Sequence, residues 1–130
     1  MMEFGYFAQT HVPTYESDND PGAEHRRLCN DLEMSVAIEQ WGYKYVWAAE
    51  HHFLHEYSHM STPEVFLSFV AARTSTLHVG SAIFNITPPV NHPARVAERV
   101  SMLDHLSQGR FEFGTGRGSS STEQKGFGIE

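Results

Sequence analysis

The sequence predicts an α/β fold in which parallel strands alternate with helices, and three observations point to it. Short apolar or aromatic runs begin near residues 3, 45, 77 and 110. Stripes of apolar residues at helical spacing follow the first three runs, and glycine or proline punctuates the junctions. Such strand–helix units, each ~30–40 residues long, are typical of parallel α/β folds.

The first half of the chain contains two strands and the helix between them. Residues 3–9 form a short aromatic strand, and a polar loop rich in proline, aspartate and glycine follows to residue 22. Apolar residues then recur at spacings of three and four from about residue 24 until Gly42 ends the helix. Residues 45–49 form an apolar run without alternation, which is typical of a strand covered on both faces.

The second half repeats this arrangement twice. Pro63 begins a helix that continues to about Ser75, and residues 77–84 return to strand character. Prolines in residues 87–89 impose a loop, Pro93 begins the next helix, and Gly109 ends it. Residues 110–113 form the fourth strand, and a further helix should begin after the glycine-rich residues 114–118.

Four such strand–helix units are compatible with two architectures. An eight-unit (β/α)8 TIM barrel typically takes about 250 residues, so the 130 residues here amount to its first four βα units. An open doubly wound sheet is the competing architecture, which periodicity does not exclude. We therefore expect residues 1–130 to be one domain that is the incomplete, amino-terminal half of a barrel.

Composition and charge narrow the class of partner. The chain is 40% hydrophobic and 19% charged, which is a globular composition, and its net charge of −7 opposes binding to nucleic acid and to anionic membranes. Neither a basic leader nor an apolar run of ~20 residues is present, and the single Cys29 suits a reducing compartment. These features predict a cytoplasmic protein without nucleic-acid or membrane partners.

Two polar segments at the predicted strand ends could carry chemistry. His51 follows the buried second strand, where its imidazole could donate a hydrogen bond or move a proton near neutral pH. Residues 114–120 combine flexible glycines, the Arg117 guanidinium and serine hydroxyls, a set that suits a phosphate group. The alternatives are a structural histidine bonded to Glu50 or to backbone, and a tight turn with a solvated Arg117.

Three evenly spaced histidines and two aromatic residues are further candidates for a functional site. His51, His55 and His59 lie four residues apart and would share a helix face able to hold zinc, but the surrounding sequence resembles a loop and lacks the His-Glu-x-x-His pattern. We therefore expect no metal site. Among the aromatic residues, Phe7 and Phe53 lie close to strand ends, where they could line a substrate pocket.

Six segments, taken in order, resemble the bacterial-luciferase-like family of flavin-dependent monooxygenases. Each is modest alone, but their order over the whole chain is specific. The segments are residues 4–7 (FGYF), 42–43 (GY) followed by 46–53 (VWAAEHHF), 72–74 (ART), 79–82 (VGSA), 92–98 (HPARVAE), and 103–111 (LDHLSQGRF) with 114–118 (GTGRG).

The resemblance implies a (β/α)8 barrel that binds reduced FMN at its carboxyl-terminal mouth and uses O2 to oxidise a small organic substrate. His51 matches the histidine implicated in activity near the flavin. Ser81 and Ala82 match a pair that lies against the isoalloxazine, often through a cis peptide. Arg117 matches the arginine that meets the flavin phosphate, and Thr115 and Gly116 fall where the fourth strand approaches the ring.

Other readings of the resemblance stay open. A related barrel of the same fold uses the deazaflavin coenzyme F420 and transfers hydride without oxygen, and a truncated relative could bind flavin without catalysis. Family chains continue for at least four further strand–helix units, so the resemblance does not imply that this chain is active by itself. Its implied partners are a flavin reductase and either a second copy, as a homo-oligomer, or the missing carboxyl-terminal half.

Overall fold

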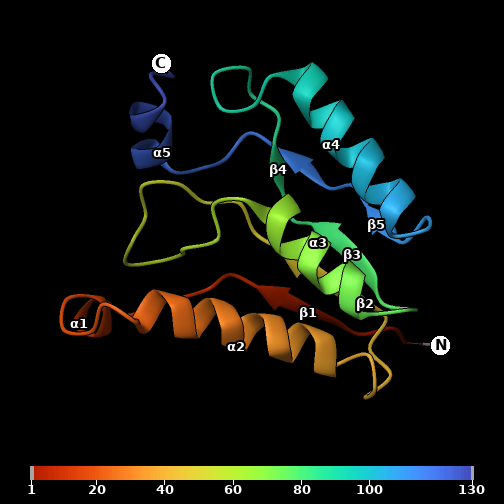
Figure 1. Cartoon of the computed structure of the whole chain (residues 1–130). Coiled ribbons are helices and arrows are strands. Elements are labelled where there is room, and N and C mark those ends of the chain that lie inside the picture. The colour runs from red at the N-terminus through yellow and green to blue at the C-terminus, as the bar shows by residue number, and fades with distance from the viewer. Residues whose placement is uncertain (1, 130) are drawn as a thin grey trace.

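The computed structural model describes residues 2–129 and contains a four-stranded parallel sheet in which neighbours in sequence are neighbours in space (Figure 1). Each pair of neighbouring strands in this sheet runs parallel. Their order is β1 (Gly5–Ala8), β2 (Tyr45–Ala48), β3 (His78–Ser81) and β5 (Phe111–Glu112). This simple progression is the order of successive strands in a (β/α) barrel.

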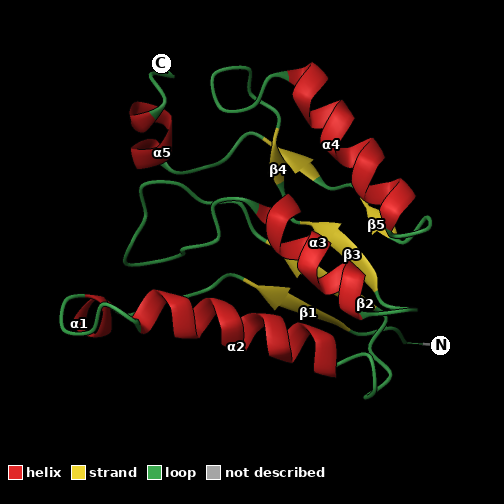
Figure 2. Ribbon diagram, viewed as in Figure 1, coloured by secondary structure: helices red, strands yellow, loops and turns green. Residues whose placement is uncertain are grey.

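The connecting helices cover one face of this sheet (Figure 2). Proline begins α3 and α4, as the sequence predicts, because its missing N–H has no partner at a first helical position. The helices are α1 (Thr14–Ser17), α2 (Ala23–Ala37), α3 (Pro63–Arg73), α4 (Pro93–Leu106) and α5 (Ser121–Gly126). A doubly wound sheet would reverse its strand order and carry helices on both faces, so the barrel-type interpretation is confirmed over that alternative.

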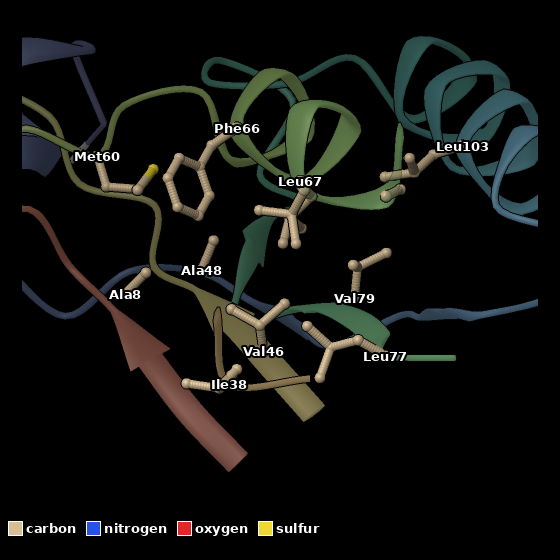
Figure 3. Packing of buried hydrophobic residues seen from close by; sticks show 12 residues of the cluster. Ala8, Ile38, Val46, Ala48, Met60, Phe66, Leu67, Leu77, Val79 and Leu103 are labelled. Carbon is tan, nitrogen blue, oxygen red and sulfur yellow. The ribbon is translucent and has the colours of Figure 1, made fainter. Parts of the chain in front are cut away.

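The hydrophobic core lies between the sheet and the helices (Figure 3). Alternate strand residues point into this core, because successive side chains of a strand lie on opposite faces of the sheet. The apolar side chains of α3 pack across β2 and β3. The strand side contributes Ala8, Val46, Ala48 and Val79, and the helices contribute Phe66, Leu67, Val70 and Leu103.

The opposite face of the sheet carries bulky side chains that no helix of the described chain covers. Phe7 on β1 is 50% exposed, and the Trp47 ring on β2 lies directly over Gly80 on β3. In a barrel this face is the interior, which is filled by side chains from all the strands. Four strands therefore present an open interior face.

The structure divides the predicted third strand, and it adds a second piece to the fourth beyond its predicted end. The third ends at Ser81 and resumes as β4 (Phe84–Asn85), and the fourth resumes after Gly114 as β6 (Thr115–Gly116). The two short pieces pair with each other in a second parallel sheet. The peptide between Ala82 and Ile83, where the third strand is divided, is cis. The prediction of continuous strands over 77–84 and 110–113 was therefore only partly right.

Glu39, just beyond α2, ties that helix to the loop before β3. Its Oε1 accepts hydrogen bonds from the backbone N–H groups of Ser75, Thr76 and Leu77 and from the Thr76 hydroxyl, at 2.6–3.0 Å. Burial opposes ionisation of this carboxyl, but the hydrogen bonds outweigh burial and hold the Glu39 pKa below its ordinary value.

Replacing the Glu39 carboxylate with an amide should lower stability most at neutral pH. A depressed folded-state pKa contributes stability above the unfolded-state pKa of ~4.3, and that contribution disappears as pH falls through the folded-state value. We expect Glu39→Gln to cost about 1–2 kcal/mol at pH 7 and much less near pH 3. Urea unfolding at both pH values measures this, and an equal loss at the two would contradict it.

No helix within residues 2–129 combines the length and the apolar character that crossing a lipid bilayer requires.

Candidate functional site

The carboxyl ends of the strands form one rim of the molecule. The loop after β2, the segment between β3 and β4, and the segment from β6 to α5 all leave the sheets at this end, on the left in Figure 1. Parallel strands place their carboxyl ends at a common edge, which is where ligands bind in α/β folds. Two buried carboxylates, Glu50 and Glu123, join these segments.

Glu50 ties the end of β2 to the segment beginning at β4. Its side chain is only 2% exposed, and its Oε2 accepts a 2.9 Å hydrogen bond from the Asn85 N–H. Its Oε1 accepts from Asn91 Nδ2 at 2.9 Å and lies 3.0 Å from His52 Nε2. A buried charge needs such compensation, so Glu50 holds the loop after β2 and the segment that begins at β4 together.

Glu123 joins α5 to the loop after β2. Its Oε1 accepts a 2.9 Å hydrogen bond from the His52 N–H and lies 3.2 Å from His51 Nδ1. Its Oε2 is buried and has no hydrogen-bond partner in the part of the chain that the structure describes. Sequence analysis missed this residue, because the only local signal is a serine three positions earlier, which favours a helix cap.

His51, the predicted functional histidine, is partly open to solvent at this rim. Its side chain is 25% exposed, and the Tyr57 ring packs edge-on against the imidazole with 5.1 Å between ring centroids. A hollow of about 260 Å³ is lined by His51, His52 and Phe53 among others. The imidazole is therefore held on one side and accessible on the other.

Ser81 and Ala82 hold the end of β3 in different ways. The Ser81 side chain is fully buried: its hydroxyl donates to the Gly114 carbonyl at 2.8 Å and accepts from the Gly114 N–H at 3.1 Å. Ala82 donates its N–H to the Ala48 carbonyl on the neighbouring strand. The Ser81 hydroxyl and the Ala82 N–H are thus both used within the protein.

Arg117, the predicted phosphate ligand, is an exposed side chain that has no hydrogen bond or ion pair with any residue in 2–129. The six other arginines of the chain all bind carboxylates or backbone carbonyls. Thr115 is exposed and Gly116 is partly buried on the preceding β6. A side chain at position 116 would lie 2.9 Å from Ile83, so glycine permits close packing there.

The predicted aromatic pocket is not a single site within the described residues. Phe53 is 57% exposed and packs against Phe127 beside α5, near the hollow with His51. Phe7 lines a different hollow of about 300 Å³ with Tyr6 and Thr10. The structure therefore brings Phe53, but not Phe7, beside the histidine.

The histidines that could have shared a metal ion contact three different carboxylates. His51 lies beside Glu123, His55 beside Glu56, and His59 beside Glu24. Across residues 2–129, no cluster of three or more His, Cys, Asp or Glu side chains is arranged to hold a metal.

Gly114 should be the glycine at the rim least tolerant of a side chain. A Cβ at Gly114 would lie 2.2 Å from the Ser81 carbonyl oxygen, a backbone atom that cannot move alone. We expect Gly114→Ala to cost about 3 kcal/mol. Gly42→Ala is the control: it has open space but a φ of +79°, which should cost about 1 kcal/mol. Chemical denaturation of both variants measures this order, and a smaller loss for Gly114→Ala would contradict it.

A protein-family model for luciferase-like monooxygenases matches residues 2–130. The chain belongs to this family. Two relatives are the 4-hydroxyprotoasukamycin monooxygenase of Streptomyces nodosus subsp. asukaensis, 35% identical over 129 residues, and the alkanal monooxygenase alpha chain of Photorhabdus laumondii subsp. laumondii, 34% identical over 129 residues. Each alignment covers 99% of this chain but only 32% or 33% of the relative. The chain thus spans about a third of the length of these luciferase-like monooxygenases.

Solved structures show the same fold over nearly the whole chain. The monooxygenase RslO1 from Streptomyces bottropensis superposes with a TM-score of 0.82 and 27% identity, covering 99% of this chain and 37% of that one. The FMN complex of the oxygenating constituent of 3,6-diketocamphane monooxygenase from Pseudomonas putida has a TM-score of 0.84 at 19% identity, covering 99% and 33%. An F420-dependent secondary alcohol dehydrogenase has a TM-score of 0.71 at 18% identity, covering 98% and 35%. Proteins solved with FMN and with an F420–acetone adduct therefore share this fold.

Proposed function

We propose that this chain carries part of the reduced-FMN site of a flavin-dependent monooxygenase that uses O2 to oxidise a small organic substrate. The observation that carries the proposal is that Arg117, which has no partner within residues 2–129, lies on the rim that also bears His51 and the Ala82 backbone. Relatives above 30% identity that are named as monooxygenases support this activity over hydride transfer.

The residues present fit an FMN phosphate better through Arg117 than through the start of α5. Ser120 Oγ already accepts hydrogen bonds from the Thr122 and Glu123 N–H groups, so these first-turn amides have partners. A guanidinium can bind phosphate through two parallel charge-assisted hydrogen bonds, and Arg117 has no carboxylate competing for it within residues 2–129. The charged Arg117 would therefore hold the phosphate.

The remaining residues would orient the ring and transfer protons. The Ala82 backbone and Gly116 would lie along the isoalloxazine, with Thr115 beside them, whereas the buried Ser81 would support Gly114 from behind. Bound reduced flavin supplies the redox chemistry with O2, and the protein binds, orients and excludes water. His51 would move a proton at its imidazole, and Phe53 would contact the substrate.

Two other functions of the same rim would be revealed by the test of this proposal. F420-dependent hydride transfer and flavin binding without catalysis both fit a rim that carries a cation and a histidine. A flavin reductase would supply reduced FMN to a monooxygenase. A second copy, or four further strand–helix units, would close the open edges of the sheet, since unpaired edges favour association.

Titration with FMN, riboflavin and F420, followed by flavin fluorescence, tests the proposal directly. We expect FMN to bind more tightly than riboflavin because of its phosphate, and F420 to bind weakly. With reduced FMN and O2, an n-alkanal or limonene, substrate classes suggested by relatives' names, should yield an oxidised product. Preferential binding of F420 would contradict the FMN proposal and indicate F420-dependent hydride transfer. FMN binding without product would indicate that the chain binds flavin without catalysis.

A further inference from the structure

Glu123 is a buried carboxylate whose hydrogen bonds serve the loop after β2 instead of its own helix. It is the third residue after Ser120, the N-cap of α5, and a glutamate at this position commonly turns back to the N-cap amide. Glu123 Oε1 reaches instead to His51 and His52, which lie 72 and 71 positions earlier in the chain. The side chain is only 7% exposed, and these hydrogen bonds offset the desolvation cost at Oε1 alone, because Oε2 has no partner within residues 2–129.

The position of Glu123 determines which imidazole nitrogen of His51 carries the proton. An ionised carboxylate only accepts hydrogen bonds, so the 3.2 Å contact with Nδ1 requires the proton on Nδ1. In the neutral ring, Nε2 is then an acceptor. Within residues 2–129, Nε2 of His51 has no hydrogen-bond partner.

The adjacent histidine shows the contrast. His52 has its Nε2 against Glu50 Oε1, and Glu50 is also occupied by Asn85 and Asn91. Its imidazole packs edge-on against Phe127, with 4.9 Å between ring centroids. His52 is thus engaged at Nε2, the ring nitrogen that His51 leaves free, so the two adjacent histidines turn opposite ring nitrogens toward their carboxylates.

We propose that Glu123 is the positioning residue for His51. It fixes the Nδ1–H tautomer and the ring orientation, and its charge stabilises the imidazolium that forms when Nε2 takes a proton. This inference rests on the proposed function for its consequence in turnover, but the tautomer it assigns does not depend on flavin.

Nitrogen NMR of the flavin-free chain tests the inference. The 130-residue chain is labelled with 15N-histidine and studied at pH 9, where neutral imidazole dominates. Long-range 1H–15N correlations identify the tautomer of each ring, and His51→Gln identifies the His51 signals by their loss. We expect Nδ1–H at His51 in the wild type, whereas free histidine favours Nε2–H.

Two variants separate the hydrogen bond from the charge. Glu123→Gln should keep the Nδ1–H tautomer, because the His52 N–H requires the amide oxygen at the same place. Glu123→Ala should shift His51 toward Nε2–H, and Glu98→Ala, which removes an exposed carboxylate on α4, should leave it unchanged. An Nε2–H majority in the wild type, or no shift in a folded Glu123→Ala variant, would overturn the inference. If circular dichroism shows that Glu123→Ala unfolds, the wild-type and Glu123→Gln tautomers decide.

Turnover with FMN gives the second measurement. We expect both Glu123→Gln and Glu123→Ala to lower kcat by roughly 10- to 100-fold, with the FMN Kd changed less than about threefold. Unchanged kcat in both variants of a protein that does bind FMN and turn over would overturn the positioning role. Failure of the wild type to bind FMN would instead count against the proposed function, because the tautomer measurement needs no flavin.

Discussion

Arg117→Ala is expected to weaken FMN binding by roughly 10- to 100-fold while changing riboflavin binding by less than about threefold. Charge-assisted hydrogen bonds contribute about 1.5–3 kcal/mol each. Riboflavin has no phosphate, so it makes no such bonds with Arg117 and should lose little affinity. Because Arg117 has no partner among the described residues, its removal should leave stability unchanged. Fluorescence titration of the variant with both flavins measures the two affinities.

Lys125→Ala is the matched control for this prediction. Lys125 is the other cation of this region and lies in the last turn of α5, and its removal changes the net charge by the same amount. We expect its FMN-to-riboflavin affinity ratio to stay near the wild-type value. If Arg117→Ala and Lys125→Ala lowered this ratio equally, a general charge effect would explain it and the phosphate assignment would be wrong.

His51→Ala is expected to lower turnover by about 10²- to 10⁴-fold while leaving FMN affinity and the fold intact. Positioned proton transfer contributes this range, and the partly exposed His51 ring has no hydrogen-bond partner at Nε2 within residues 2–129. The variant leaves the Glu123 carboxylate bonded to the His52 N–H, which should keep α5 in place. Product formation with reduced FMN and O2, together with circular dichroism, measures both parts.

His55→Ala separates a specific role of His51 from a general loss of imidazole. His55 lies in the same loop, but its side chain is 70% exposed and pairs only with the exposed Glu56 among the described residues. We expect wild-type turnover from this control. Wild-type-like turnover in His51→Ala would refute the assignment of His51 whatever the control does.

The sheet could be predicted from sequence because its signals are local. Residues 45–49 are apolar without interruption, and the structure buries alternate side chains there under α3 while the others line the barrel interior. Proline at positions 63 and 93 begins α3 and α4 as predicted. Division of the third and fourth strands was not predictable, because Ser81 and Gly114 hold each other across 33 positions and residues 77–84 contain no breaker pattern.

The site was less accessible to sequence reasoning than the fold. A strand end followed by histidines is visible locally, so His51 could be proposed from its position alone. The two buried carboxylates that assemble the rim act on partners far along the chain: Glu50 on Asn85 and Asn91, and Glu123 on His51. Spacing does not encode such contacts, and the serine before Glu123 indicates a different local role.

Backbone NMR of the chain during FMN addition tests most directly whether the three strand ends form one flavin-binding rim. The account predicts that amide signals of residues 51–53, 82–83 and 115–118 shift together with a single Kd. Shifts confined to the outer groove between α2 and α3, which Cys29 and Phe69 line, would place the ligand on the wrong side of the sheet. That result would contradict the account.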